Sequence, residues 1–299
     1  MSVKEKTEKF EVSILMAVSE MDIKRKSLFN ALRGISIQKT PYNFELCVID
    51  DYSQKDIKGI INDFFKKYPN PNLKRIAVAS LKKKGGFTKA PAQAINIVSP
   101  ESQKMFILAS DCVLLKENSI YEICNRVGPK KVVYSEVAEV VLPFDFYLNF
   151  DKAAQEVIND WENHLFTKPA MVSRRYPAQS WLFFSGAALK KDLFSIDYDK
   201  ISCDAVLWQK MMPSGFEAEI LTYIPTAHQA HKRSAYPCPR VLQCPYHCSR
   251  TRAAKGIRAP TWRSDYPATI VFENEGEVKR QYPHAQLATK SSAPLRVPK

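Results

Sequence analysis

Residues 45–53 read ELCVIDDYS, a short apolar run that leads directly into two adjacent carboxylates. A run of this length with polar residues on both sides is typical of a buried strand, and the acidic pair Asp50 and Asp51 ends it. A second run of the same kind, VSILMAV at residues 12–18, precedes it in the chain. These two strands and the carboxylates that follow the second one decide the predicted fold.

Helical and strand patterns alternate outward from these two runs. Residues 105–109 form a further apolar run, and Ser110 and Asp111 follow it directly. The other elements expected in this half are a strand over residues 75–79 and three helices, from Asp22 to Ile35, from Ile57 to Phe65 and from Ala90 to Val98. Asp22 is the expected N-cap of the first helix. This alternation predicts an α/β fold with a mostly parallel, doubly wound sheet and helices on both faces. Because ligands bind beyond the carboxyl ends of such strands, both acidic strand ends should face one crevice.

The second half of the chain has a less regular pattern. Expected there are a Val-rich stretch near residues 132–142, a helix from Asp151 to Leu165 and a helix over residues 204–212. From Ala235 onward prolines are frequent and no periodicity is sustained, which favours an irregular segment. We therefore predict an α/β domain over residues 1–235 and an irregular, Pro-rich and basic C-terminal extension over residues 236–299.

The chain is basic, with 44 Lys and Arg against 31 Asp and Glu and a formal net charge of +13. Residues 232–299 hold 13 of the basic residues and 4 of the acidic ones, so most of the excess lies in the extension. A basic tail on a nearly neutral body favours an arm that docks on an anionic surface or a membrane face. Nucleic acid, which a chain-wide basic field would favour, is the less favoured partner.

The cysteines and the N-terminus indicate the compartment. Seven cysteines are an odd number, and the three after residue 235 lack the C-x2-C spacing of a zinc knuckle. The other four fall in apolar or helical patterns, where cysteine is usually a buried apolar residue: Cys47, Cys112, Cys124 and Cys203. The charged opening MSVKEKTEKF does not resemble a signal peptide. We expect a cytoplasmic protein that is at most peripheral to a membrane.

Glycine usage excludes two common kinds of nucleotide site. The chain has nine glycines, and none falls in a G-x-G-x-x-G or G-x-x-x-x-G-K-[ST] arrangement. A dinucleotide-binding dehydrogenase is therefore disfavoured. Carboxylates that face each other in one crevice repel, and one takes up a proton unless a cation or hydrogen-bond donors lie between them. A divalent metal ion with a nucleoside diphosphate meets that need.

An ordered set of segments supports this interpretation. Residues 12–22, VSILMAVSEMD, lead to ELCVIDDYS at 45–53, and FILASDCVLL at 106–115 contains a single Asp at its strand end. Further segments are Gly85–Ala90 with Asn96, Phe184–Ala187, Pro225 with His228, and the spacing of Asp204, Leu207, Lys210 and Gly215. Together, over about residues 11–233, they resemble glycosyltransferase family 2, a group of inverting, nucleotide-sugar-dependent enzymes with the GT-A fold.

The resemblance implies a role for each candidate residue. Nucleotide binding falls to Asp50, Asp51, Lys89 and Ser110, metal binding to Asp111 and His228, and the acceptor side to Trp181, Ser185 and Gly186. Asp50 or Asp51 would accept hydrogen bonds from the base or the ribose, the alternative being a cap or turn aspartate of the next helix. Asp111 and His228 offer the oxygen and imidazole ligands that suit Mn²⁺ or Mg²⁺.

Asp204 is identified as the catalytic base, since a carboxylate within about 3 Å of a sugar hydroxyl can take its proton as the new bond forms. A helix N-cap is the alternative role for this residue. Three positions depart from the family pattern. Ala109 replaces the first Asp of the D-x-D element, Cys203 replaces a Glu, and Lys210 replaces an Arg and so loses its planar two-point grip.

The sequence thus predicts a metal-dependent inverting glycosyltransferase. It would move a sugar from a nucleoside diphosphate donor, UDP-linked in our interpretation, to a hydroxyl of a glycan, a lipid-linked or a protein acceptor. Two alternatives stay open. Ala109 is compatible with a non-catalytic GT-A-like binding protein tethered by its basic tail. A nucleotidyltransferase has a similar sheet and acidic site, but residues 19–26 lack the glycine- and arginine-rich loop expected of it.

Overall fold

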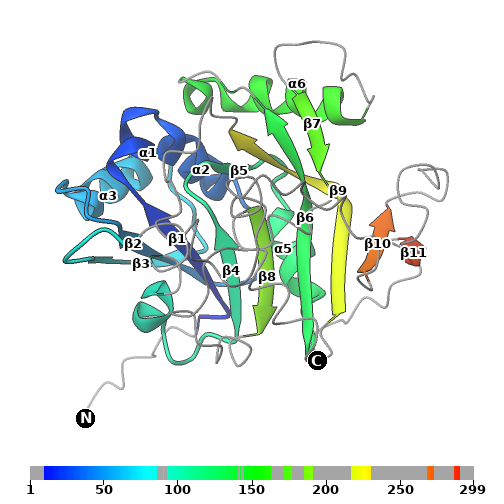
Figure 1. The fold of residues 1–299 in the computed structure, drawn as a ribbon, viewed down its shortest axis with the longest axis horizontal. Helices are drawn as coiled ribbons and strands as arrows, with labels where there is room; N and C mark the ends of the chain where they lie inside the picture. The colour runs from blue at the N-terminus through cyan, green and yellow to red at the C-terminus, as the bar shows by residue number, and fades with distance from the viewer. Residues whose placement is uncertain are drawn as a thin grey trace, which may run out of the picture.

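A computed structural model gives the fold of the protein (Figure 1). It describes residues 10–85, 90, 93–140, 142, 145–162, 172–176, 185–190, 217–229, 268–272 and 286–289.

Four parallel strands form the first half of the sheet, in the order β3-β2-β1-β4. They are β1 (Val12–Val18), β2 (Phe44–Asp50), β3 (Leu73–Ser80) and β4 (Lys104–Leu108). Every residue of β2 is buried, as is typical of an inner strand covered on both faces. All four strands lie where the sequence predicts them.

The alternating side chains of β1 and β2 divide between the two faces of the sheet. On one face, Ile14, Met16, Leu46 and Val48 pack in a single apolar core with the helices α2 (Ser27–Ser36) and α3 (Ile57–Lys67). On the other face, the strand residues contact the segment around the 3-10 helix η1 (Ala94–Ile97). Helices therefore cover one face as predicted, and the described part of the other face is covered by the segment around the short 3-10 helix η1.

Two helical predictions need correction. The helix expected from Asp22 to Ile35 is divided into α1 (Glu20–Lys24) and α2, because Lys26 adopts a left-handed conformation with φ of 60°. Ser19, rather than Asp22, is the N-cap residue of α1. Within the described part of the segment from Ala90 to Val98, the structure has the short 3-10 helix η1 in place of a full α-helix.

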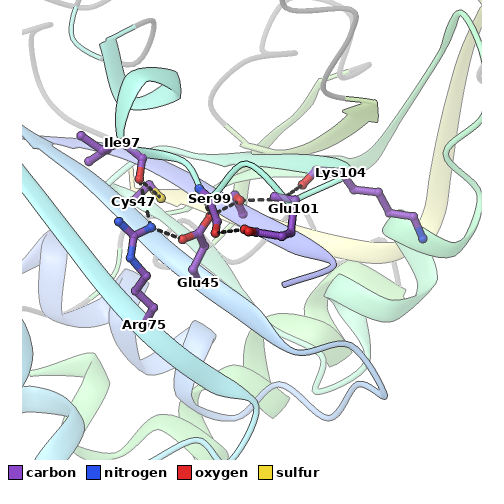
Figure 2. Close-up of polar contacts among 9 residues, drawn as sticks. Glu45, Cys47, Arg75, Ile97, Ser99, Glu101 and Lys104 are labelled. Carbon is purple, nitrogen blue, oxygen red and sulfur yellow. Dashed lines mark hydrogen bonds and ion pairs between the residues drawn. The ribbon is translucent and has the colours of Figure 1, made fainter. Parts of the chain in front are cut away.

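A group of polar residues fastens the η1 segment to the sheet (Figure 2). We call it the Glu45 cluster; its members are Ser13, Glu45, Arg75, Ser99 and Ser102. The Glu45 carboxylate is fully buried, accepts from Ser13 Oγ at 2.5 Å and from the Ser99 backbone N–H at 2.7 Å, and is ion-paired with Arg75. The cluster thus satisfies a buried charge within the protein.

The second half of the sheet is mixed. From β4 it continues through β8 and β6 to β9, β10 and β11, seen from left to right in Figure 1. The strands are β5 (Cys112–Leu114), β6 (Lys131–Val140), β7 (Val172–Tyr176), β8 (Ser185–Lys190) and β9 (Glu217–Gln229). Strand β8 runs antiparallel to both β4 and β6, and β6 is parallel to β9. Among the described residues, parallel pairings outnumber antiparallel ones, so the predicted α/β fold with a mostly parallel sheet is confirmed.

Three further helical segments complete the described fold, namely α5 (Ser119–Asn125), η2 (Phe146–Leu148) and α6 (Phe150–Glu162). Phe146, Phe150 and Val157 pack with Val113 of β5 in a second apolar core. The helix predicted from Asp151 therefore forms as expected within the described residues. The helix predicted over residues 204–212 lies outside them.

Two strands occur within the C-terminal extension, β10 (Ala268–Phe272) and β11 (Gln286–Thr289). Strand β10 pairs in parallel with β9, and β11 with β10. The prediction of an irregular segment is therefore incomplete, because the extension contains two short strands that its sequence pattern did not indicate. The domain boundary at residue 235 stays a prediction. No helix in the described parts of the chain has the length and apolar character that a bilayer crossing needs.

Candidate functional site at the carboxyl edge of the parallel strands

Asp50 and Asp51 lie side by side at the carboxyl end of β2, and both are buried. Asp50 Oδ1 accepts from the Ser53 backbone N–H at 2.8 Å, and Asp51 Oδ1 accepts from that of Gly85 at 2.5 Å. Asp56, at 2.9 Å from the Gly59 amide, is the cap of α3, so neither member of the pair caps that helix. The bond of Asp50 instead shapes the turn after β2, and the bond of Asp51 holds Gly85 in the segment after β3.

The turn that follows the acidic pair has an unusual backbone. Tyr52 and Gln54 both have positive φ values, of 61° and 57°. A bulky residue seldom adopts this conformation, which tends to persist where surrounding contacts enforce it. The Tyr52 side chain is exposed, so the turn presents an aromatic residue that directly follows the two carboxylates in the chain. Sequence reasoning did not single out Tyr52.

A continuous series of contacts joins this turn to the end of β4. The Asp51 backbone N–H donates to the Val18 carbonyl at 2.8 Å, at the end of β1. The next residue, Ser19, donates to the Asp22 carboxylate from both its backbone N–H and its hydroxyl, at 2.7 and 2.6 Å. Asp22 in turn lies close enough to Ser110 and Asp111, after β4, for both to act on its pKa. The two acidic strand ends therefore meet at one edge of the sheet.

Asp22 is a site residue that sequence reasoning missed. Its pKa is raised, first because burial disfavours the charged form and second because the Asp111 carboxylate lies close; hydrogen bonds from Ser19 and Ser110 partly oppose the shift. The sequence assigned Asp22 to a helix cap. The signal available was the spacing Ser19-x-x-Asp22 directly after β1, which places a carboxylate at the same edge.

Asp111 and His228, the predicted metal ligands, lie together. Asp111 Oδ2 is 3.5 Å from His228 Nε2, and the Asp111 side chain is 22% exposed. They come from distant parts of the chain, since His228 is on β9, which pairs with β5 directly after Asp111. The Gln229 backbone N–H donates to the Asp111 carbonyl at 2.8 Å and fixes this arrangement. We call Ser19, Asp22, Ser110, Asp111 and His228 the Asp111 cluster.

Cys112 adjoins this cluster. Its fully buried thiol donates to Asp111 Oδ1 at 3.9 Å. Burial raises the pKa of this thiol well above its ordinary value, and the neighbouring Asp111 charge adds to the effect. In the protein alone the Cys112 thiol is therefore protonated and uncharged at neutral pH.

The chemistry of the cluster fits a divalent cation. Asp111 supplies a carboxylate and His228 an imidazole. The pKa of Asp22 is raised by burial and, second, by repulsion from Asp111, and a nearby cation would relieve that repulsion. Ala109, in place of the first D-x-D carboxylate, packs against the apolar core and contributes no ligand. Asp22 places a second carboxylate in the cluster from a different strand end.

The acceptor-side residues are only partly within the described residues. Ser185 and Gly186 begin β8, where Ser185 is the backbone partner of Leu108 at the end of β4. The predicted acceptor turn thus adjoins the same edge of the sheet. Lys89, Trp181 and Asp204 lie outside the described residues, so their predicted roles stay predictions.

Comparison with solved structures finds similarity at low sequence identity. It is similar to the mannosyltransferase PcManGT from Pyrobaculum calidifontis in complex with GDP-Man and Mn²⁺, with 18% identity and a TM-score of 0.47 over 85% of this chain and 67% of that one. S. aureus TarS gives 12% identity and a TM-score of 0.47 over 74% and 37% of the two chains. TarS 1–349 in complex with UDP-GlcNAc gives 18% identity and a TM-score of 0.33, over 45% of this chain and 37% of that one. The chain thus spans little more than a third of TarS. No protein-family model and no curated protein matches it.

Proposed function

We propose that this protein is a metal-dependent inverting glycosyltransferase of the family 2 type. The observation that carries the proposal is the joining of two acidic strand ends, through Val18, Ser19 and Asp22, at the carboxyl edge of one parallel sheet. Ligands bind at this edge in open α/β sheets. The resemblance of the sequence to the family supports the same interpretation.

The donor nucleotide would bind over the turn after β2. A carboxylate accepts several hydrogen bonds, so Asp50 and Asp51 keep acceptor capacity for a base or ribose while they hold the turn. The exposed ring of Tyr52 beside them offers a surface on which a base can stack. Lys89 and Ser110 would contact the diphosphate. These contacts orient the donor with its sugar toward the Asp111 cluster.

Asp111 and His228 would hold Mn²⁺ or Mg²⁺, and such an ion, when bound, offsets the negative charge that builds on a departing diphosphate. The acceptor hydroxyl would bind beside β8, near Ser185, Gly186 and Trp181. Its oxygen attacks the anomeric carbon opposite the diphosphate, the bond to the phosphate oxygen breaks, and Asp204 takes the hydroxyl proton. A single displacement of this kind inverts the configuration at that carbon.

A panel of nucleotide sugars tests the proposal by thermal shift with and without Mn²⁺, followed by measurement of diphosphate release. A UDP-linked sugar at 100 times its Kd should stabilise the protein by about 2.7 kcal/mol. Asp111→Asn should lose the Mn²⁺-dependent part. Asp63→Asn, which removes an exposed carboxylate of α3 paired with Lys66, should keep it. Equal behaviour of the two variants, or no stabilisation by any donor, would contradict the proposal.

A second function is favoured by one observation. Ala109 packs against the core where the family places a carboxylate, as a protein that binds nucleotide sugars without turning them over would allow. The two functions differ in one measurement, since a binding protein would show donor stabilisation with no diphosphate release. Asp204→Asn decides for the enzyme if it abolishes release while donor affinity stays within a few-fold.

A further inference from the structure

Strands β5 and β9 place a thiol and an imidazole opposite each other. Cys112 and His228 are backbone partners in this antiparallel pair. Residues directly opposite on antiparallel strands project to the same face, with Cβ atoms about 4.5–5.5 Å apart. Asp111 precedes Cys112, and its carboxylate reaches the same point. One ligand atom from each of the three residues lies within 4.8 Å of the other two.

The separations reach slightly beyond those around a small bound cation, and two of them involve different oxygens of the Asp111 carboxylate. Zinc bonds of about 2.0–2.3 Å in tetrahedral geometry place neighbouring ligand atoms roughly 3.3–3.8 Å apart. In this structure Asp111 Oδ2 and His228 Nε2 are 3.5 Å apart, and Cys112 Sγ and Asp111 Oδ1 are 3.9 Å apart. The three side chains therefore need only small movements to bind one ion together.

We propose that Asp111, Cys112 and His228 form a three-ligand site for a thiophilic divalent cation of the zinc class. A carboxylate and a thiolate together balance the two positive charges, so the assembled site is neutral, as a mostly buried position requires. The thiol proton leaves to solvent when the ion binds. Three protein ligands leave a fourth coordination position for water or a ligand oxygen.

The thiol sets the choice of metal. Mg²⁺ prefers oxygen ligands in octahedral geometry, and soft thiolate favours zinc-like ions over Mg²⁺ and Mn²⁺. The proposed zinc-class site shares Asp111 and His228 with the proposed Mn²⁺ or Mg²⁺ position. Bound Zn²⁺ would therefore exclude the catalytic ion and inhibit transfer. This inhibition rests on the proposed function, whereas the three-ligand site does not.

The test uses the full chain freed of metal and titrated with Co²⁺, whose bond to a thiolate gives a charge-transfer absorption band. The wild type should show the band, and Cys112→Ser should lose one equivalent of it. Competition of Zn²⁺ with a chromophoric chelator measures the Zn²⁺ affinity of each protein. Loss of an outer-shell partner of a metal ligand lowers affinity ~10–100-fold, and loss of the ligand Cys112 should lower it at least as much. Cys124→Ser is the matched control, because Cys124 is also a buried free cysteine but lies on α5 in the apolar core.

His228→Ala provides a second measurement in which every thiol is kept. It should lower Zn²⁺ affinity and alter the cobalt band, which separates this site from the cysteines elsewhere in the chain. If Cys112→Ser does not fold, as circular dichroism would show, His228→Ala and Asp111→Asn decide the question. An equal band and equal Zn²⁺ affinity in wild type and variants would overturn the site. Mn²⁺-dependent UDP binding, measured in the same preparation, shows separately whether the proposed function stands.

Discussion

Glu45 and Asp22 are both carboxylates held by serine residues of the same half of the molecule, but the charges around them differ. Glu45 accepts from Ser13 and Ser99 and is also ion-paired with Arg75. The hydrogen bonds that the structure describes for Asp22 come from neutral donors, and the charge that shifts its pKa is the negative one of Asp111. The Glu45 carboxylate is thus neutralised by an arginine, whereas the described charge that acts on Asp22 is a second carboxylate.

The difference separates a structural carboxylate from one suited to bind. The Glu45 cluster joins β2, β3 and the η1 segment, so its ion pair fastens three elements together (Figure 2). The Asp111 cluster lies at the carboxyl edge of the parallel strands, where ligands bind in open α/β sheets. The two carboxylates, Glu45 on β2 and Asp22 on α1, therefore suit different uses, and each can be altered separately.

The largest effect is expected from Arg75→Met, which leaves Glu45 buried without its cation. Removal of one partner of a buried ion pair costs about 3–5 kcal/mol, and the lower end applies because Arg75 is 41% exposed. Chemical denaturation should show this loss in the free energy of unfolding. Adding Glu45→Gln to the variant should recover part of the loss, because no charge then remains buried.

Lys66→Met is the matched control for that substitution. Lys66 pairs with Asp63 in α3, and both side chains are about three-quarters exposed (77% and 74%). An exposed pair contributes about 0–1 kcal/mol, so this variant should unfold at nearly the wild-type denaturant concentration. Equal losses for Arg75→Met and Lys66→Met would show that the Glu45 cluster does not hold the sheet and the η1 segment together.

A smaller loss of stability is expected from Gly34→Ala, which acts on the Asp111 cluster through β5. A Cβ at Gly34 would lie 2.8 Å from the backbone nitrogen of Leu114 and 2.9 Å from its carbonyl oxygen. Helix α2 would have to move away from β5, the strand that follows Asp111. Overpacking of this kind costs about 1–3 kcal/mol. Mn²⁺ binding should weaken as well.

Gly128→Ala tests whether this effect is specific. A Cβ there meets nothing closer than the Lys131 Cβ at 3.7 Å, an ordinary contact. Its free energy of unfolding and Mn²⁺ affinity should stay near the wild-type values. If Gly34→Ala weakened neither stability nor Mn²⁺ binding, the close approach of α2 to β5 would not be what positions Asp111.

The sequence was sufficient to predict most elements of the first half of the chain and part of the candidate site, for reasons that differ between residues. Apolar runs and helical spacing depend on local pattern, so β1 to β4 and α3 could be predicted, and Asp50, Asp51 and Asp111 could be placed because they directly follow strands. Lys26 broke the first helix through a left-handed backbone conformation that its residue type does not announce.

Contacts between distant segments could not be predicted in the same way. His228 meets Asp111 through the pairing of β9 with β5, and Arg75 meets Glu45 across β3 and β2. Such pairs depend on strand register, which a single sequence does not specify. The membership of Asp22 in the Asp111 cluster was hidden for a different reason, since a capping residue and a site residue have the same local pattern.

The smallest effect, and the most specific, is expected from Asp22→Asn. The pKa of Asp22 is raised above its ordinary value of 3.8, so the folded protein binds a proton at this group more tightly than the unfolded chain does. The contribution of Asp22 to stability is therefore fully present below pH 3.8 and is lost as the pH rises through the folded pKa. The variant lacks this loss, while its amide oxygen can still accept from Ser19.

Unfolding free energies of wild type and Asp22→Asn, measured over a pH series, should therefore change relative to each other. The variant should gain on the wild type as the pH rises from about 4, because its neutral amide avoids the cost of burying a charge and, second, the repulsion with Asp111. Saturating Mn²⁺ at neutral pH should reduce this advantage, since a cation near Asp111 relieves the same repulsion in the wild type. A constant difference at every pH would mean that Asp22 is only a capping residue. The contrast with Glu45 would then depend on hydrogen bonds alone.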